Sequence, residues 1–249
     1  MIFMKFFSFS LLFFISHSLT AQTIHLKTEH YPPYNYDLKA AGEGVGVGGA
    51  ATEVVLELMR RSGYSYTLDL VSWKRAYGAA KDEQHTGVYC IVRTPEREKS
   101  FKWVGPIAEN NYVLLSNGTK DITINSQEDL KNYTVGAYRG SAGEGFIKAL
   151  GLPLESVRSD HLNALKLQRN RIDLWVAGHL YAPYFVKQLA KKHESLSNMK
   201  LQPVYTMQET KMYLAFSLST PDAVIDKLQG ILDKMQIEGF LDSVYIRYK

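Results

Sequence analysis

One arginine that follows directly on an expected strand is well placed to bind a ligand. Segment 92–97 (Val-Arg-Thr-Pro-Glu-Arg) ends the apolar run 86–92, and open α/β sheets bind ligands beyond the carboxyl ends of their strands. Thr94 can cap a helical turn that begins at Pro95, and Arg97 then projects from that turn. A guanidinium there can hold a carboxylate through two parallel hydrogen bonds, the alternative being an ordinary solvated surface arginine.

Other kinds of chemistry have little support in the sequence. There is no Gly-x-Ser-x-Gly elbow, and the single cysteine, Cys90, lies in an apolar strand where a buried inert thiol is the usual outcome. The histidines lack metal-ligand spacing, so neither a metal nor a cofactor is expected. The run 44–49 matches G-x-G-x-x-G, but it follows a turn instead of a strand, which favours a loop over a dinucleotide site.

The composition is that of a globular protein. Of 249 residues, 45% are hydrophobic and 22% charged, which excludes disorder or a coiled coil as the main state. The net charge of +4 comes from 29 basic and 25 acidic residues, too small an excess to suggest a nucleic-acid partner.

The first residues have the pattern of a secretory signal. Lys5 precedes an apolar core at 6–19, and small residues follow, so we expect a signal peptide over 1–21 with cleavage near Ala21. The apolar core is shorter than the roughly 20 residues that span a bilayer. We therefore expect an exported, soluble mature chain in the periplasm.

The elements that position Arg97 read as two successive α/β blocks. The first has the order β-α-β-α-β within about 70 residues, which predicts a parallel sheet with helices on its faces. The first block comprises strands 23–28, 64–71 and 86–92 with helices 50–61 and 73–81; strand 112–115, a helix start at 126–130, strands 133–137, 156–158, 171–177 and 211–217, and helices 145–150, 161–169, 182–193 and 221–236 follow.

Two blocks of similar size predict two lobes with a cleft between them, a preferred place for ligands.

Several runs occur in an order that carries a family resemblance: TEHYPPYNY, ATEVVLELM, SWKRAY, RTPERE, FKWVGP, LKNYTVGAYRGSAGE, NRIDLWVAG and EGFLDSVYIRY. With this set the chain resembles the family 3 extracellular solute-binding proteins, the bacterial periplasmic proteins for polar amino acids and similar solutes.

The resemblance implies a two-lobed periplasmic-binding-protein-like type II fold of the α/β class, with a ligand cleft between lobes that close by a hinge motion. It implies two crossing hinge strands, which we place near 109–112 and 204–208. Lobe 1 is expected over 22–109 and 207–249, and lobe 2 over 110–206.

The resemblance also implies roles for individual residues. Arg97 matches the arginine that grips the ligand α-carboxylate, Tyr31 matches an aromatic side chain that covers the ligand, and Trp73 lies where a second pocket side chain is expected. The loop Arg139-Gly140-Ser141 matches a second-lobe loop whose amides and hydroxyl meet the same carboxylate, which suits a helix start.

The chain departs from the family pattern in two places. Ser or Thr donors usually stand before the TPER motif, where this chain has Tyr89, Cys90 and Val92, and an acidic residue that pairs with the ligand ammonium is replaced by Gly178. Together with a group of arginines, this predicts a small anionic or carboxylate-bearing, amino-acid-like solute. The predicted ligand-binding residues are Glu29, Tyr31, Tyr34, Trp73, Arg75, Tyr89, Arg93, Arg97, Arg139, Ser141 and His179.

The expected function is solute capture without chemistry, by a monomer whose partner is an ABC permease or a membrane sensor. One alternative is a lyase or dehydratase for small carboxylates on the same fold, which needs a general acid or base such as Glu29, His30 or His179. Another is a ligand-sensing module for a membrane receptor.

Overall fold

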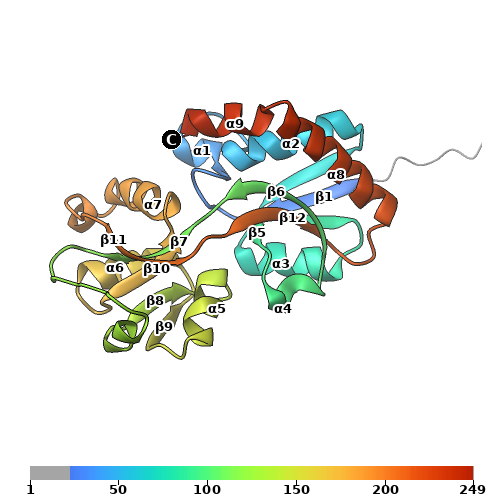
Figure 1. Ribbon diagram of the computed structural model, residues 1–249. Helices are drawn as coiled ribbons and strands as arrows, with labels where there is room; N and C mark the ends of the chain where they lie inside the picture. Colours follow the sequence, from blue (N-terminus) through green and yellow to red (C-terminus); the bar gives the residue numbers. More distant parts are fainter. Residues whose placement is uncertain (1–22, 249) are drawn as a thin grey trace, which may run out of the picture.

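The protein folds into two α/β lobes, each built around a five-stranded sheet (Figure 1). The computed structural model describes residues 23–248, so the expected signal peptide and its cleavage near Ala21 lie outside the described residues. The α/β class and the two-lobed arrangement predicted from the sequence are confirmed.

The sheet of lobe 1 has the strand order β4-β1-β5-β12-β6. Strand β1 pairs in parallel with β4 and β5, as the sequence predicts, whereas β12 runs antiparallel to both β5 and β6. The prediction of parallel pairing for the first block is therefore confirmed, and the two antiparallel neighbours arise because β12 returns from the other lobe. The strands are β1 (Ile24–Thr28), β4 (Tyr66–Leu70), β5 (Thr86–Val92), β6 (Lys102–Glu109) and β12 (Lys211–Phe216).

Helices cover both faces of this sheet. Helices α2, α8 and α9 pack on one face, and α3 and α4 lie on the other (Figure 1). Helix α2 buries Val54, Val55 and Leu58 at helical spacing and ends at Gly63, whose φ of 71° only glycine adopts readily. The helices are α2 (Ala50–Ser62), α3 (Trp73–Asp82), α4 (Pro95–Glu98), α8 (Asp222–Ile237) and α9 (Phe240–Tyr245), with the short elements β2 (Tyr36–Asp37), α1 (Leu38–Ala41), β3 (Val47–Gly48) and η3 (Ile246–Tyr248).

Lobe 2 has the strand order β11-β7-β10-β8-β9. Along β10, Leu174 and Val176 pack on the face of α5, while Trp175 and Ala177 pack on the face of α6 and α7, so both faces are buried. The elements are β7 (Tyr112–Ser116), η1 (Glu128–Asn132), β8 (Val135–Tyr138), α5 (Ala142–Ala149), β9 (Leu154–Val157), α6 (Asp160–Gln168), β10 (Leu174–Gly178), α7 (Tyr181–Ala190), η2 (Glu194–Leu196) and β11 (Gln202–Gln208).

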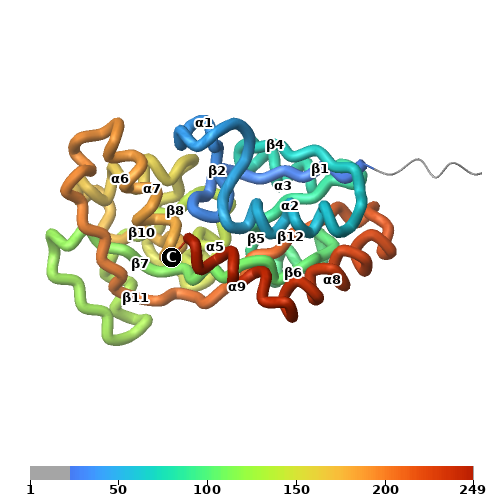
Figure 2. The backbone as a smooth tube through the Cα atoms, turned by 90° about the horizontal axis from the view of Figure 1, so that it is seen from above, coloured from blue at the N-terminus to red at the C-terminus, as the bar shows by residue number. Residues whose placement is uncertain are grey.

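The chain passes between the sheets twice, from β6 to β7 and from β11 to β12, and the two passages lie side by side (Figure 2). The Asn110 N–H donates to the Thr210 carbonyl over 2.9 Å, and the Thr210 hydroxyl donates to the Asn110 carbonyl. The first passage falls within the predicted crossing at 109–112, whereas the second, at 209–210, comes directly after the predicted 204–208, which belongs to β11 of lobe 2.

Side chains of lobe 1 hold β6 in place up to the crossing. The Gln236 amide donates to the Pro106 carbonyl, and the Tyr245 and Tyr34 hydroxyls donate to the carbonyls of Ile107 and Glu109, each over 2.8 Å. Since β6 is the edge strand, these donors occupy carbonyls that no neighbouring strand pairs with.

Two elements differ from the sequence prediction for clear reasons. Strand β6 was not predicted, because Gly105 and Pro106 interrupt its pattern, but an edge strand tolerates a proline that lacks an N–H. The expected helix start at 126–130 is the short 3₁₀ turn η1 at Glu128–Asn132, where the Asp129 carboxylate accepts from the N–H groups of Asn125 and Ser126.

Phe216 tests how far lobe 1 depends on the returning strand. Its side chain is fully buried, and its ring occupies the space above Gly87 where any larger residue would carry a Cβ. We expect Phe216→Ala to lower the free energy of unfolding by about 3–5 kcal/mol, measured by urea denaturation followed by circular dichroism. The nearby Leu218, which is 54% exposed, is the control. Equal midpoints for Phe216→Ala and Leu218→Ala would contradict this account.

Candidate ligand-binding site between the two lobes

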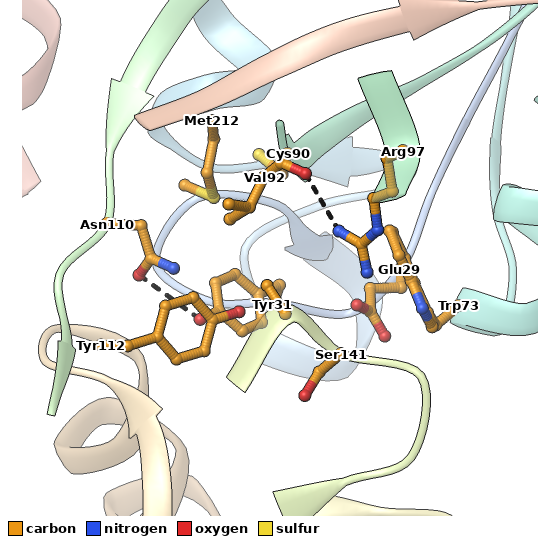
Figure 3. Close-up of a pocket in the computed structure, with 11 residues that line it drawn as sticks. Glu29, Tyr31, Trp73, Cys90, Val92, Arg97, Asn110, Tyr112, Ser141 and Met212 are labelled. Carbon is orange, nitrogen blue, oxygen red and sulfur yellow. Dashed lines mark hydrogen bonds between the residues drawn. The ribbon is translucent and has the colours of Figure 1, made fainter. Parts of the chain in front are cut away.

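The lobes meet around a small enclosed space, here called the inner chamber (Figure 3). Its volume of about 20 Å³ is room for roughly one water molecule. The lobes are therefore closed on each other. Its lining residues are Glu29, Tyr31, Trp73, Cys90, Val92, Arg97 and Met212 from lobe 1, Asn110 from the crossing, and Tyr112, Ser141 and Ala142 from lobe 2.

Arg97 lies at one end of the inner chamber. It follows Pro95 in the short helix α4, as the sequence predicts, and its side chain is buried. One guanidinium nitrogen donates to the Val92 carbonyl over 3.0 Å, and another donates over 2.9 Å to the Gly140 carbonyl of lobe 2. The guanidinium also lies over the Trp73 ring, 5.2 Å from its centroid.

The Gly140 carbonyl accepts from lobe 1 a second time. The Trp73 indole N–H donates to it over 3.1 Å, so two donors of lobe 1 converge on one acceptor of lobe 2. Gly140 has a φ of 78°, a left-handed conformation that favours glycine and turns this carbonyl toward lobe 1. The carbonyl and its two donors form the closest polar connection across the cleft.

The amide and hydroxyl groups of the loop before α5 have partners within lobe 2. Ser141 is the N-cap of α5, and its hydroxyl accepts from the Glu144 N–H over 3.1 Å. The Gly140 N–H donates to the Glu144 carboxylate over 2.7 Å. Glu144 therefore supplies the negative charge that the positive end of this helix favours.

Two acids at the site have raised pKa values, which favours their neutral form. The pKa of the Glu29 carboxyl is raised to about 8, first by burial and then by the nearby charge of Asp160, while a hydrogen bond with Tyr138 and the charge of Arg97 oppose the rise. Burial likewise raises the pKa of Asp160 to about 6, although Asn163 and Trp175 donate to its carboxylate over 2.9 and 3.0 Å. Glu29 lines the inner chamber, and its carboxyl shares a hydrogen bond with Tyr138 of lobe 2.

An aromatic stack forms another wall. Tyr31 stacks on Tyr181 of lobe 2, with ring centroids 4.2 Å apart, and its hydroxyl donates to the Asn110 side-chain oxygen over 3.4 Å. Both the hydroxyl and that oxygen occupy the space where residue 178 would carry a Cβ. This explains physically why Gly178 stands where an acidic residue was expected from the resemblance.

Cys90 reaches the inner chamber through an irregularity in β5. The pairing with β12 passes from Tyr89–Leu214 to Ile91–Tyr213, which leaves Cys90 as the extra residue of a bulge, with a φ of 62°. Burial, and then the charge of Glu29, raises the pKa of its thiol well above the ordinary value, so the thiol stays protonated.

The residues predicted from the sequence divide between this chamber and other places. Glu29, Tyr31, Trp73, Arg97 and Ser141 line the chamber. The other six do not: Tyr34 and His179 line a separate cavity of about 380 Å³, Tyr89 is buried against Thr52 at 3.0 Å, Arg93 pairs with Glu98 at 2.5 Å, Arg75 is exposed on α3, and Arg139 lines a larger cavity beyond Gly140.

Sequence reasoning missed Asp160, Asn110 and the Gly140 carbonyl. Asp160 follows Ser159 at the start of α6, where an acidic residue ordinarily serves the helix end, so its pattern gave no functional signal. Among residues 23–248, no group of three or more His, Cys, Asp or Glu side chains is arranged to hold a metal ion.

Comparison with known proteins agrees with this geometry. No family model matches the chain. It is 25% identical over 221 residues to the arginine-binding extracellular protein ArtP of Bacillus subtilis (strain 168), which covers 86% of this chain and 80% of ArtP.

Two solved structures share its fold. The substrate-binding protein of an amino acid ABC transporter superposes with a TM-score of 0.74 at 17% identity, covering 91% of this chain and 99% of that one. A histidine kinase sensor domain with similarity to periplasmic binding proteins gives a TM-score of 0.77 at 16% identity, covering 91% and 95%. The chain thus has the two-lobed fold of the periplasmic binding proteins, and its resemblance to the family 3 extracellular solute-binding proteins is confirmed.

Proposed function

We propose that this protein captures a small amino-acid-like solute outside the cytoplasm and retains it by closing its two lobes. The observation that carries the proposal is the inner chamber, in which a buried arginine and a buried carboxyl lie within one enclosed space lined by both lobes. In the closed form described here the chamber has room for about one water molecule, so a bound solute requires the lobes to stand further apart, and it then touches both of them.

The charges favour a zwitterion over a purely anionic solute. Arg97 suits a carboxylate, as the sequence predicts. Glu29 and Asp160 are two acids in surroundings that disfavour negative charge, so an incoming ammonium group would compensate Glu29. Glu29 thereby takes the place of the acid that Gly178 does not provide.

Simple binding is favoured over lyase or dehydratase chemistry. Of the general acids or bases considered, only Glu29 lines the inner chamber, whereas His30 and His179 line two other cavities. Glu29, with its raised pKa, can donate or accept a proton, as catalysis would require. The same carboxyl can hold the ammonium group of a bound solute, as binding requires.

The expected destination of the solute is an ABC permease or a membrane sensor, and the expected location is the periplasm. ArtP is an extracellular arginine-binding protein, and the two similar folds belong to a transporter component and to a sensor domain, which supports both uses. No helix among residues 23–248 is long and apolar enough to cross a membrane.

The zwitterion proposal can be tested with matched sets of solutes by calorimetry. Each set contains an amino acid, the amine that lacks its carboxylate and the hydroxy acid that lacks its ammonium. We expect the amino acid of one set to bind at least about 30-fold more tightly than both analogues, because each analogue leaves a buried charge unpaired at a cost of about 2 kcal/mol or more. Equal affinity for the hydroxy acid would instead identify an anionic solute. Recovery of the solute unchanged is expected, and its conversion would identify an enzyme.

Arg97 variants test the carboxylate contact. We expect Arg97→Ala to weaken binding of that amino acid by about 30-fold or more. The affinity of Arg97→Lys should lie between those of the parent and of Arg97→Ala, because lysine keeps the charge without the planar fork. Arg75→Ala is the control, since Arg75 is an exposed arginine of the same lobe. Unchanged affinity in Arg97→Ala would show that Arg97 does not hold the solute.

Glu29→Gln separates binding from stability. The pKa of the Glu29 carboxyl is higher in the folded protein than in the unfolded chain. The protonated carboxyl is therefore tolerated in the fold at a pH below its unfolded pKa, and folding loses this contribution as the pH rises toward about 8. We therefore expect Glu29→Gln to raise the Tm of the solute-free protein at pH 8, leave it unchanged at pH 4, and weaken amino-acid binding. The exposed Glu83→Gln is the control. A lower Tm at pH 8 would show that Glu29 is a structural acid.

A further inference from the structure

A second, larger cavity lies on the other side of Arg97 and Trp73. These two side chains line both the inner chamber and this outer chamber, which has a volume of about 730 Å³. Their shared hydrogen bonds to the Gly140 carbonyl form a partition between the two spaces. The outer chamber is therefore a separate compartment of the same cleft.

The outer chamber carries an excess of positive charge from both lobes. Lys74 of α3 lines it from lobe 1, and Arg139 and Arg158, which follow β8 and β9, line it from lobe 2. None of the three has an ion pair within residues 23–248, and Glu96 is the single acidic residue of the described lining. Arg93, in contrast, is neutralised by Glu98 nearby.

The position of these cations is set in part by the fold. The Arg139 guanidinium donates to the Ser156 hydroxyl and carbonyl over 3.3 and 3.2 Å, which orients it at the rim. Tyr77 of lobe 1 and Tyr138 of lobe 2 contribute aromatic side chains to the lining of the outer chamber. Bringing cations together on closure costs free energy through repulsion, and an anion between them reverses the sign of this contribution.

We propose that the outer chamber is a second binding site, for a small molecule with two or more phosphate or carboxylate groups, and that its occupation favours lobe closure. The anion bridges Lys74 of lobe 1 and Arg139 and Arg158 of lobe 2. By linkage, an anion that binds the closed form more tightly also raises the affinity of the inner chamber for its solute. This coupling rests on the proposed function, whereas the anion site itself does not.

The test titrates the intact mature protein with pyrophosphate and, separately, with citrate, at constant ionic strength maintained with sodium chloride. We expect saturable calorimetric binding and a rise in Tm with at least one of them, because three cations that line one cavity favour a multivalent anion over chloride. Pyrophosphate and citrate distinguish the phosphate from the carboxylate form of the ligand. A response no greater than that to sodium chloride would overturn the proposal.

Variants locate the site. We expect Lys74→Gln/Arg158→Gln to weaken anion binding by about tenfold or more, which corresponds to about 1.4 kcal/mol. The control Lys81→Gln/Arg169→Gln removes one exposed cation from each lobe, neither of which lines the outer chamber, and should bind as the parent does. Equal loss in both double variants would reveal a non-specific charge effect and overturn the assignment.

A last measurement separates this site from the proposed function. Amino-acid affinity is determined with and without saturating anion in the parent and in Lys74→Gln/Arg158→Gln. We expect the anion to raise affinity several-fold in the parent only. If the anion binds but no amino acid does, the proposed function fails and the anion site stands. If the amino acid binds with equal affinity in both conditions, the coupling between the chambers is refuted.

Discussion

The two lobes depend on the paired crossing of the chain at Asn110 and Thr210. The chain leaves lobe 1 once and returns once, so the sheet of lobe 1 is completed only by the returning strand β12, and the two passages lie together. Their mutual hydrogen bonds hold the two passages together, while the sheets on either side are packed on both faces. The site inherits its geometry from this arrangement, since every chamber wall belongs to one lobe or to the crossing.

The closed cleft combines favourable and unfavourable contributions. The Gly140 carbonyl accepts from Trp73 and Arg97, and Tyr31 stacks on Tyr181, so several contacts join the lobes directly. Against these stand the desolvated Glu29 carboxyl in one chamber and the excess of cations around the other. Such opposing contributions keep an equilibrium between two forms sensitive to small molecules, because a solute needs to supply only the missing charge.

Much of the fold could be predicted from the sequence because it depends on local patterns. Alternating strands and amphipathic helices predicted the two lobes, and Pro95 at the start of a helical turn predicted where Arg97 projects. Thr94 occupies the N-cap position but makes no side-chain capping hydrogen bond. The returning strand β12 runs antiparallel for a reason that no local pattern carries, since it follows from the path through lobe 2.

The site was only partly predictable. A backbone acceptor such as the Gly140 carbonyl has no side-chain signature. The Tyr31 hydroxyl fills the space where residue 178 would carry a Cβ, and these two residues are far apart in the sequence. The bulge that brings Cys90 into the chamber depends on its pairing with β12, so an inert strand residue and a chamber residue look alike in the sequence. Asp160, too, looks in the sequence like an ordinary acidic residue in the first turn of a helix.

The donors that hold the carbonyls of β6 have a mechanical consequence. Because the Tyr34 hydroxyl holds the Glu109 carbonyl, the backbone that passes between the lobes without a contact of this kind begins at Asn110 and is very short. Asn110 also lines the inner chamber, so a solute that binds there would lie beside the crossing between the lobes. Ser141 lines the chamber from lobe 2 at a distance from this crossing, so a change in the angle between the lobes would displace it more than Asn110.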